Sequence, residues 1–294
     1  TTGGVETFAR NLETVFEEVE YLAPGVGDMA AAVRDRVPVI CDNQMVLDWP
    51  DNHPVIGFQH GVAKVKAQLT RTRTDRRLAR QQAKAAKRPR TLWVACARWI
   101  SRTFDELYQN PAHHVLYHQV EVDRFDGQLN NGDSNLLLHD GRAEHKGRDL
   151  YPHLIKAFPD WRFEGLSCAP AEVPARMRQG RAFLHLSRYE GNSIVCNEAM
   201  AMDLPCLFTR VGLMQDDEDL DVHIVDSEDV YGKKDRLIQT IGGFLETLSS
   251  RTWNPRRWSM ENATPAVHRD GWRRVMNDFQ RMSEWDLGLK TGTD

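Results

Sequence analysis

The chain has 294 residues, of which 41% are hydrophobic and 27% charged, a balance that excludes an intrinsically disordered protein and suits one large or two medium-sized domains. No apolar run reaches the length of a membrane span and the start lacks a signal-peptide pattern, so we expect a cytoplasmic protein, with peripheral attachment to a membrane surface as the alternative. The formal net charge of −4 is close to neutral, but it is unevenly distributed.

Strand-like and helix-like segments alternate through the first part of the chain. Residues 4–19 have apolar side chains at helical spacing and are predicted to form a helix. Strands are predicted at 37–41, 54–58, 92–96 and 114–118, and helices at 64–86 and 99–109. The opening Thr1-Thr2-Gly3-Gly4 is typical of a loop that follows a strand, so we expect a first strand upstream of it.

Residues 64–90 are strongly basic. They contain eleven Lys or Arg and one acid, Asp75, so this segment carries about +10 and the remainder of the chain about −14. One interpretation is a long solvated helix with its exit loop. The other is contact with an anionic partner: membrane lipid, an acidic polymer or nucleic acid. Because the segment lacks a strong apolar stripe, it would rest on a charged surface rather than enter a bilayer.

A second alternation follows a dense run of turn formers from Asp126 to Ser134. Strands are predicted at 135–139, 161–166, 182–186, 205–208 and 222–226, with helices at 146–157, 171–179, 192–202 and 233–248. Two such runs predict two doubly wound parallel sheets. We therefore expect domains at 1–126 and 135–265, a linker at 127–134, and a closing amphipathic helix with its tail at 266–294.

Cysteine spacing and acidic residues give little support for a metal site. Four of the five cysteines sit in or beside apolar segments, so buried free thiols are favoured over disulfides. No Cys-x-x-Cys or His-Glu-x-x-His spacing occurs. The acidic run Asp216, Asp217, Glu218 and Asp219 is better explained as a solvated loop than as a cation site.

Two glutamates stand eight residues apart where the second domain would bind a ligand. Glu190 lies in the polar turn after the strand 182–186, and Glu198 lies in the next helix. Doubly wound sheets hold ligands at this carboxyl end of their strands. Eight helical steps would separate the two residues by roughly 12 Å. The pair therefore suits two parts of one long ligand better than a shared proton.

Three motifs occur in order: Gly3-Gly4-Val5-Glu6, then Gly141-Arg142-x3-Lys146-Gly147, then Glu190-Gly191-x6-Glu198-Ala199-Met200-Ala201. Together they resemble the retaining GT-B glycosyltransferases with the E-x7-E signature, the family 4-like or group 1 enzymes. The resemblance covers nearly the whole chain. It implies an α/β fold of two Rossmann-like, doubly wound parallel-sheet domains facing a cleft. It also implies transfer of a sugar from a nucleotide-diphosphate sugar, most often a UDP- or GDP-sugar, with retention and without a bound metal or permanent cofactor.

The resemblance assigns roles around the donor. Arg142 and Lys146 would neutralise the diphosphate, and the helix that begins near Asn192 would direct backbone N–H groups at phosphate. Glu190 would accept hydrogen bonds from sugar hydroxyls, and Glu198 from ribose hydroxyls. The implied donor-binding set is Gly3, Gly4, Gly141, Arg142, Lys146, Glu190, Gly191, Asn192, Ser193, Ile194 and Glu198.

His60 completes the implied catalytic set, with Glu190, Arg142 and Lys146. It follows the strand 54–58 at a position where the family places a His or polar residue near the transferred sugar; a structural hydrogen-bonding role is the alternative. Asp42-Asn43, at the end of the strand 37–41, could face the acceptor.

Two positions depart from the family pattern. Asp203 stands where the family often has Gly, and Gly212-Leu213 replaces a common Gly-Gly. The second change puts the identity of the sugar in doubt.

Two other functions remain open. A glycoside hydrolase also uses two carboxylates, but a neutral glycan needs no cationic pair for a diphosphate. A non-catalytic nucleic-acid-binding module would depend on residues 64–90. For a glycosyltransferase, the acceptor could be a glycan, a lipid-linked sugar or modified DNA.

Overall fold

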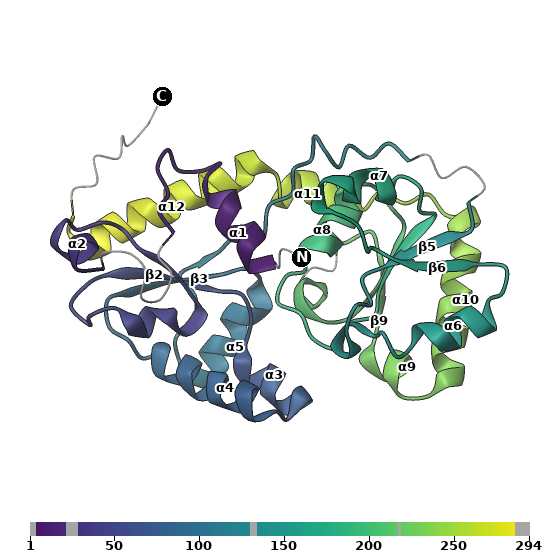
Figure 1. The fold of residues 1–294 in the computed structure, drawn as a ribbon, viewed down its shortest axis with the longest axis horizontal. Helices are drawn as coiled ribbons and strands as arrows, with labels where there is room; N and C mark the ends of the chain where they lie inside the picture. Colours follow the sequence, from purple (N-terminus) through teal and green to yellow (C-terminus); the bar gives the residue numbers. More distant parts are fainter. Residues whose placement is uncertain (1–3, 22–28, 130–133, 217–218, 286–294) are drawn as a thin grey trace. The chain divides into compact units, whose positions relative to one another are not determined.

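A computed structural model describes residues 4–21, 29–129, 134–216 and 219–285 (Figure 1). The chain divides into two compact units. Residues 9–117 and 268–294 form the N-terminal-sheet unit, and residues 1–8 and 118–267 form the C-terminal-sheet unit. The segment expected as a linker, 127–134, lies within the second unit, while most of the expected closing helix lies within the first.

The N-terminal-sheet unit is built on four parallel strands in the order β1-β2-β3-β4. Each overlaps a predicted strand, and their bounds are Ile40–Asp42, Val55–Gln59, Thr91–Ala95 and His114–Val115. Every residue of β2 and β3 is buried, as expected for central parallel strands that are covered on both faces. The other elements are α1 (Gly4–Leu12, which begins in the second unit and is shorter than predicted), α2 (Met29–Arg34), η1 (Asn43–Asp48), α3 (Ala63–Thr70), α4 (Arg73–Ala85) and α5 (Arg98–Tyr108).

The prediction of one helix over residues 64–86 is wrong. Arg71 has a left-handed φ of 54°, which ends α3, and the side chain of Thr72 accepts a hydrogen bond from the backbone N–H of Asp75, which caps the start of α4. A Thr cap satisfies one of the free N–H groups at a helix start, so it favours a new helix at this point. The basic segment is therefore a pair of packed helices.

The last helix, α12 (Pro265–Ser283), packs on the N-terminal sheet (Figure 1). The fully buried ring of Trp272 stacks on Phe58 of β2 with 6.0 Å between centroids. Gly271 leaves the space that a side-chain carbon of Leu116 fills, since a Cβ there would lie 2.4 Å from it. Nε2 of His114 in β4 is 2.9 Å from Oδ2 of Asp278 in α12. Most of α12 therefore belongs to the unit formed by strands β1 to β4.

The C-terminal-sheet unit has five parallel strands in the order β6-β5-β7-β8-β9. Their bounds are β5 Leu136–His139, β6 Arg162–Gly165, β7 Ala182–His185, β8 Cys206–Thr209 and β9 His223–Val225. The helices are η2 (Glu144–Lys146), α6 (Tyr151–Ala157), η3 (Pro170–Glu172), α7 (Val173–Met177), α8 (Ile194–Ala201), η4 (Gly212–Gln215), α9 (Ser227–Tyr231), α10 (Lys234–Ser250) and α11 (Arg256–Asn262). β6 lies on one side of β5 and β7 on the other, so the strand order reverses there. Such a reversal opens a crevice at the carboxyl ends of the two strands between which it occurs, here β5 and β7.

All five cysteines are free thiols and four are buried, as predicted. Within the described ranges, no helix is both long and apolar enough to cross a bilayer. The same residues contain no group of three or more His, Cys, Asp or Glu side chains arranged to hold a metal ion.

Candidate functional site

Four ionisable side chains gather at the carboxyl ends of β5 and β7, where the strand order reverses. Asp140 directly follows β5 and His185 is the last residue of β7. Lys146 and Glu190 lie in the loops that follow these two strands. The loops start at neighbouring strand ends, so Lys146 and Glu190, 44 positions apart in sequence, become neighbours in space, as do Asp140 and His185, 45 positions apart.

Two glycines allow the loop after β5 to fold tightly. Gly147 has a left-handed φ of +77°, and a Cβ on it would lie 2.3 Å from the backbone oxygen of Leu186, just beyond β7. A Cβ on Gly141 would lie 2.2 Å from the ring of Tyr151. Only glycine tolerates both the conformation and the close approach at position 147. The loop therefore lies against the end of β7 and carries Lys146 to Glu190.

Lys146 lies between two carboxylates. Its Nζ forms an ion pair with Oε1 of Glu190 and is 3.2 Å from Oδ2 of Asp140. His185 contacts the same two acids: its Nδ1 is 2.7 Å from Oδ1 of Asp140, and its Nε2 is 3.4 Å from Oε1 of Glu190. Ser187 donates a hydrogen bond of 2.9 Å to the same oxygen of Glu190.

Burial makes this cluster electrostatically strong. The side chains of His185 and Asp140 are 1% and 2% exposed, against 18% and 15% for Lys146 and Glu190. Burial alone would disfavour every charge, but each charged group has an opposite charge beside it. The pKa of Glu190 is about 2, because its contacts with His185 and Lys146 outweigh burial. For Asp140, too, burial is outweighed, by His185 and then Lys146, and its pKa is lowered.

The two cations are shifted in the opposite direction. Burial lowers the pKa of Lys146, but Glu190 and Asp140 more than reverse this and raise it. Burial also lowers the pKa of His185, and the neighbouring Asp140 raises it well above its ordinary value. At neutral pH the cluster is thus two carboxylates, an ammonium and an imidazolium.

Asp140 and His185 were missed in the sequence analysis. The signal was present: Asp140 directly follows four strand residues that begin Leu136-Leu137-Leu138, and His185 lies inside the apolar run 182–186. A charged residue at a buried strand position almost always has a partner. The sequence does not say which partner, because that depends on β5 and β7 being adjacent.

Arg142 lies two residues after Asp140 and is exposed. No hydrogen bond or ion pair from its side chain to a described residue occurs in the structure. Both predicted diphosphate ligands therefore belong to one short loop, but Lys146 is held in the cluster while Arg142 extends into solvent.

The loop after β7 leads into α8. Gly191 and Asn192 are buried, Ser193 is the N-cap residue with an extended backbone, and Ile194 is the first residue of the helix. Gly212 packs against this loop: it has a φ of +61°, and a Cβ on it would lie 2.8 Å from both Cβ of Glu190 and the backbone oxygen of Gly191.

The two departures from the family pattern have clear structural settings. Asp203 has a left-handed φ of 61°, a conformation that explains why glycine is common there. Its carboxylate accepts a 3.2 Å hydrogen bond from the backbone N–H of Arg256, which helps to hold it. Leu213 is 2% exposed and contributes to the core.

Glu198 lies in α8, outside the four-residue cluster. Glu198 is partly exposed to solvent, and no described residue forms a hydrogen bond or ion pair with its side chain. The surrounding protein nevertheless raises its pKa to about 7, mainly by burial, with Arg124 lowering it and Glu121 raising it further. Glu198 is therefore close to half ionised at neutral pH.

In the N-terminal-sheet unit, His60 lies close to Asp42 and Asn43. His60 directly follows β2, Asp42 is the last residue of β1, and Asn43 directly follows β1. Nε2 of His60 is 2.8 Å from Oδ1 of Asp42, and the backbone N–H of His60 donates to Oδ1 of Asn43 at 3.0 Å. The imidazole side chain is 12% exposed. The contacts fix its orientation.

The remaining predicted positions are less informative. Gly3 lies outside the described residues, as do Asp217 and Glu218 of the acidic run. Gly4 is the first residue of α1.

No protein-family model matches the sequence, and no curated protein matches it. Several solved structures are similar. Sucrose-phosphate synthase from Thermosynechococcus elongatus superposes with a TM-score of 0.65 at 13% identity, over 86% of this chain and 76% of that one. HepE from Anabaena, in complex with UDP, gives 0.65 at 14% identity, over 87% and 84%. A glycosyltransferase from Rickettsia africae gives 0.61 at 12% identity, over 97% and 89%.

At these identities the similarity establishes the fold alone. Two parallel α/β sheets and these neighbours together show the GT-B fold class that the motifs predicted.

Replacing Gly147 should destabilise the protein, because any side chain there meets the backbone oxygen of Leu186 in a left-handed conformation. We expect Gly147→Ala to lower the free energy of unfolding by about 1–3 kcal/mol. Gly243→Ala, in the interior of α10 with nothing within 4 Å of the new Cβ, is the matched control. It should stabilise the protein by about 0.5–1 kcal/mol. Urea unfolding of both variants measures the difference; equal effects would contradict the role of Gly147.

Removing the charge of Asp140 should cost about 3 kcal/mol, since it leaves His185 and Lys146 buried with one carboxylate fewer. The pKa of Asp140 is lowered, so its contribution is present above its unfolded pKa near 4 and is lost as pH falls. The pKa of His185 is raised, so its contribution is complete below its unfolded pKa near 6.5 and is lost as pH rises through the raised value. The penalty of Asp140→Asn should therefore peak between about pH 4 and pH 6.5.

Urea unfolding across pH checks this profile. Asp149→Asn is the control: it also breaks an ion pair, with Arg188, but Asp149 is 46% exposed. It should change the free energy of unfolding by less than about 1 kcal/mol. A pH-independent penalty for Asp140→Asn would contradict the charged state of the cluster.

Proposed function

We propose that this protein transfers a sugar from a nucleotide-diphosphate sugar to an acceptor hydroxyl, with retention at the anomeric carbon. The observation that carries the proposal is the largely buried Lys146–Glu190 pair at the point where the strand order of the sheet reverses. Structural neighbours support the donor class: HepE has been solved with UDP and with UDP-glucose. A UDP-sugar is accordingly the first donor to test, and a GDP-sugar the second.

Lys146 and Arg142 are our candidates for the diphosphate. An ammonium group has three N–H donors, and Asp140 and Glu190 account for two of them. The side chain of Lys146 remains 18% exposed, so a third donor can reach an incoming phosphate oxygen. Arg142 is exposed and without a protein partner in the described part of the chain, so its planar fork is available to a second oxygen.

Glu190 is our candidate for the sugar hydroxyls. Its contacts with Lys146, Ser187 and His185 are made by Oε1, so we assign Oε2 to the sugar. With a pKa of about 2, Glu190 is ionised across the physiological range and can only accept hydrogen bonds. This disfavours Glu190 as the proton donor that a glycoside hydrolase would need.

The chemistry we infer depends on electrostatic stabilisation and positioning. As the bond between sugar and diphosphate breaks, negative charge grows on the leaving group, beside Lys146 and Arg142. Cations fixed in advance at that position stabilise the transition state without reorganising. His60, oriented by Asp42, is our candidate for contact with the transferred sugar. Backbone N–H groups at the start of α8 are candidates for a further phosphate contact.

Thermal-shift and calorimetric titration against UDP-glucose, UDP-N-acetylglucosamine and GDP-mannose tests donor binding, because a ligand of the folded state raises the melting temperature. Arg142→Gln should weaken binding of the true donor about tenfold, by loss of one charge-assisted contact. Arg148→Gln is the matched control: Arg148 is an exposed residue just beyond the same loop, and we expect less than a twofold change. Binding of none of these donors, or equal losses in both variants, would contradict the assignment.

Retention and transfer need a product assay. Incubation with donor and acceptor should release the nucleoside diphosphate and preserve the anomeric configuration, which NMR of the product resolves. Cleavage of a glycan without nucleotide release would instead indicate the hydrolase.

Donor affinity should rise with pH through the titration of Glu198. Its pKa is raised to about 7 by burial, and only the ionised carboxylate offers two acceptor oxygens to the ribose hydroxyls. If the ionised form alone binds, affinity should increase about tenfold from about pH 6 to pH 8. UDP-glucose is the right probe, because the terminal phosphate of UDP itself titrates near pH 6. Glu198→Gln should bind more weakly and show a flat profile; a variant with the same pH dependence would exclude Glu198 as the group responsible.

A further inference from the structure

The helices α3 and α4, hereafter the basic hairpin (residues 63–85), present unpaired positive charge. Their exposed cations are Lys64, Arg71, Arg73, Arg76, Arg77, Arg80 and Lys84. In the described part of the chain none of the seven forms an ion pair with an acid. The hairpin contains one acid, Asp75, and its side chain is directed inward and not toward these cations.

That acid, Asp75, is buried and fully engaged. Its carboxylate accepts hydrogen bonds from the hydroxyls of Thr70 and Thr72 at 2.6 and 2.7 Å and lies 3.5 Å from Nζ of Lys66. These contacts lower its pKa, so it stays ionised while it stabilises the turn between the helices. Asp75 therefore shapes the hairpin and neutralises only Lys66, a residue outside the exposed set.

The cations of α4 form one continuous stripe. Arg73, Arg76, Arg77, Arg80 and Lys84 fall within an arc of about 100° when successive residues are turned by 100°. The stripe rises roughly 16 Å, or about three helical turns. The opposite side of α4 bears the buried residues Asp75, Gln82 and Ala85.

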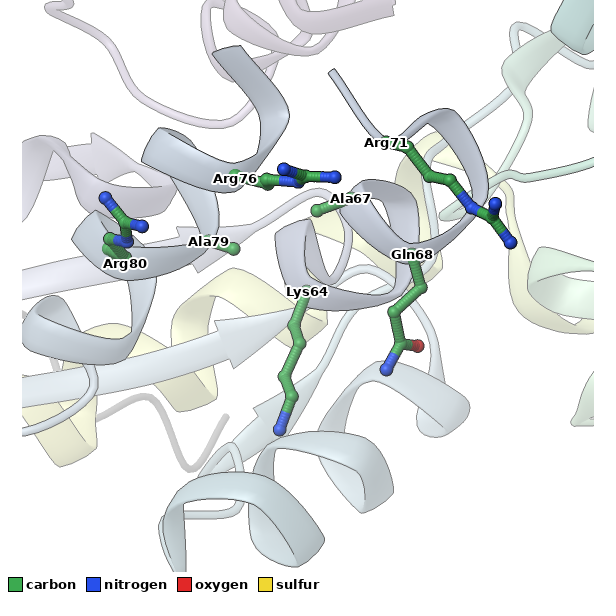
Figure 2. A pocket seen from close by; sticks show the side chains of 7 residues that line it. All are labelled: Lys64, Ala67, Gln68, Arg71, Arg76, Ala79 and Arg80. Carbon is green, nitrogen blue, oxygen red and sulfur yellow. The ribbon is translucent and has the colours of Figure 1, made fainter. Parts of the chain in front are cut away.

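A shallow groove lies between the two helices (Figure 2). Four of the side chains that line it are cationic: Lys64 and Arg71 from α3 and its end, and Arg76 and Arg80 from α4. The rest are Ala67, Gln68 and Ala79, so the lining contains no acid. A groove with positive charge on both walls is suited to a chain of phosphates.

We propose that the basic hairpin binds the phosphate backbone of double-stranded nucleic acid. Arginine predominates in the stripe, and its planar fork matches phosphate oxygens better than lysine does. Residues 63–90 contain no aromatic side chain, so they offer no platform on which single-stranded bases could stack. A lipid surface is a poorer fit, because a membrane-bound helix inserts apolar side chains and Leu69 is the large hydrophobic residue that the hairpin exposes.

The charge balance of the chain supports the same conclusion. The basic hairpin, with eight Lys or Arg and one acid, carries about +7 and the remainder of the chain about −11, so a polyanion is attracted to the hairpin and repelled elsewhere. Contacts of this kind carry no sequence information. The surface would locate the protein on a duplex without selecting a site.

Fluorescence anisotropy with a labelled DNA duplex of about 20 base pairs, titrated with salt, tests the proposal. Affinity should fall steeply as salt rises, because each phosphate contact releases a counterion. The variant Arg73→Gln, Arg76→Gln, Arg80→Gln should weaken binding at least tenfold and reduce the salt slope by about three. Lys233→Gln, Lys234→Gln, Arg236→Gln is the matched control, with the same charge change on exposed residues of the other unit. It should leave both quantities nearly unchanged.

Three results would overturn the proposal: no binding to the duplex, equal losses in the two triple variants, or tighter binding to anionic phosphatidylserine vesicles or to single-stranded DNA than to the duplex. The experiment needs no sugar donor, so it is independent of the proposed transferase activity. UDP-glucose should raise the melting temperature of both triple variants as it does in the unmodified protein. Duplex binding without any donor response would leave this inference standing and remove the proposed function.

Discussion

Lys146 lies between Asp140 and Glu190, and the candidate site depends on that one interaction. A buried ammonium group is unfavourable unless carboxylates surround it, and a buried carboxylate is unfavourable without a cation. His185 supplies the second positive charge, so two acids and two bases stabilise one another. The result is an ionised Glu190 and an ionised Lys146, both oriented before any ligand arrives. Orientation in advance is what electrostatic catalysis requires, since fixed charges need not reorganise during the reaction.

Backbone conformation makes this cluster possible. Gly147 lets the loop after β5 approach the end of β7, and Gly212 lets another loop pack on Glu190 and Gly191. Asp203 has the same left-handed conformation although it is not a glycine. A hydrogen bond from the backbone N–H of Arg256 to its carboxylate offsets part of the energetic cost of that conformation. Asp203 thus belongs to the end of α8 and not to the loop that carries Glu190.

The charged groups of the molecule fall into two kinds. In the cluster at β5 and β7, every charge has an opposite partner and is largely withdrawn from water. On the basic hairpin, seven cations face solvent without acids, and the one acid of the segment serves the turn. The first kind has almost no net charge and holds its groups in defined orientations. The second favours an extended polyanion that is bound by many weak, salt-sensitive contacts.

The sequence by itself determined the order and type of almost all the strands, because apolar runs and turn formers are local signals. It also placed Lys146 and Glu190 in the loops that follow two of these strands, and Glu198 in the next helix. It gave the wrong answer for residues 64–86, where the left-handed Arg71 and the Thr72 cap divide a helical pattern in two.

Only the tertiary structure decided which charges meet. Asp140 and His185 are 45 residues apart, and they pair because β5 and β7 are hydrogen-bonded neighbours. The tertiary structure also assigned α12 to the N-terminal sheet, through Trp272 on Phe58 and Asp278 on His114. Periodicity shows that a helix has an apolar face, but it does not name the surface that covers it. That choice depends on contacts between distant residues, which no local pattern encodes.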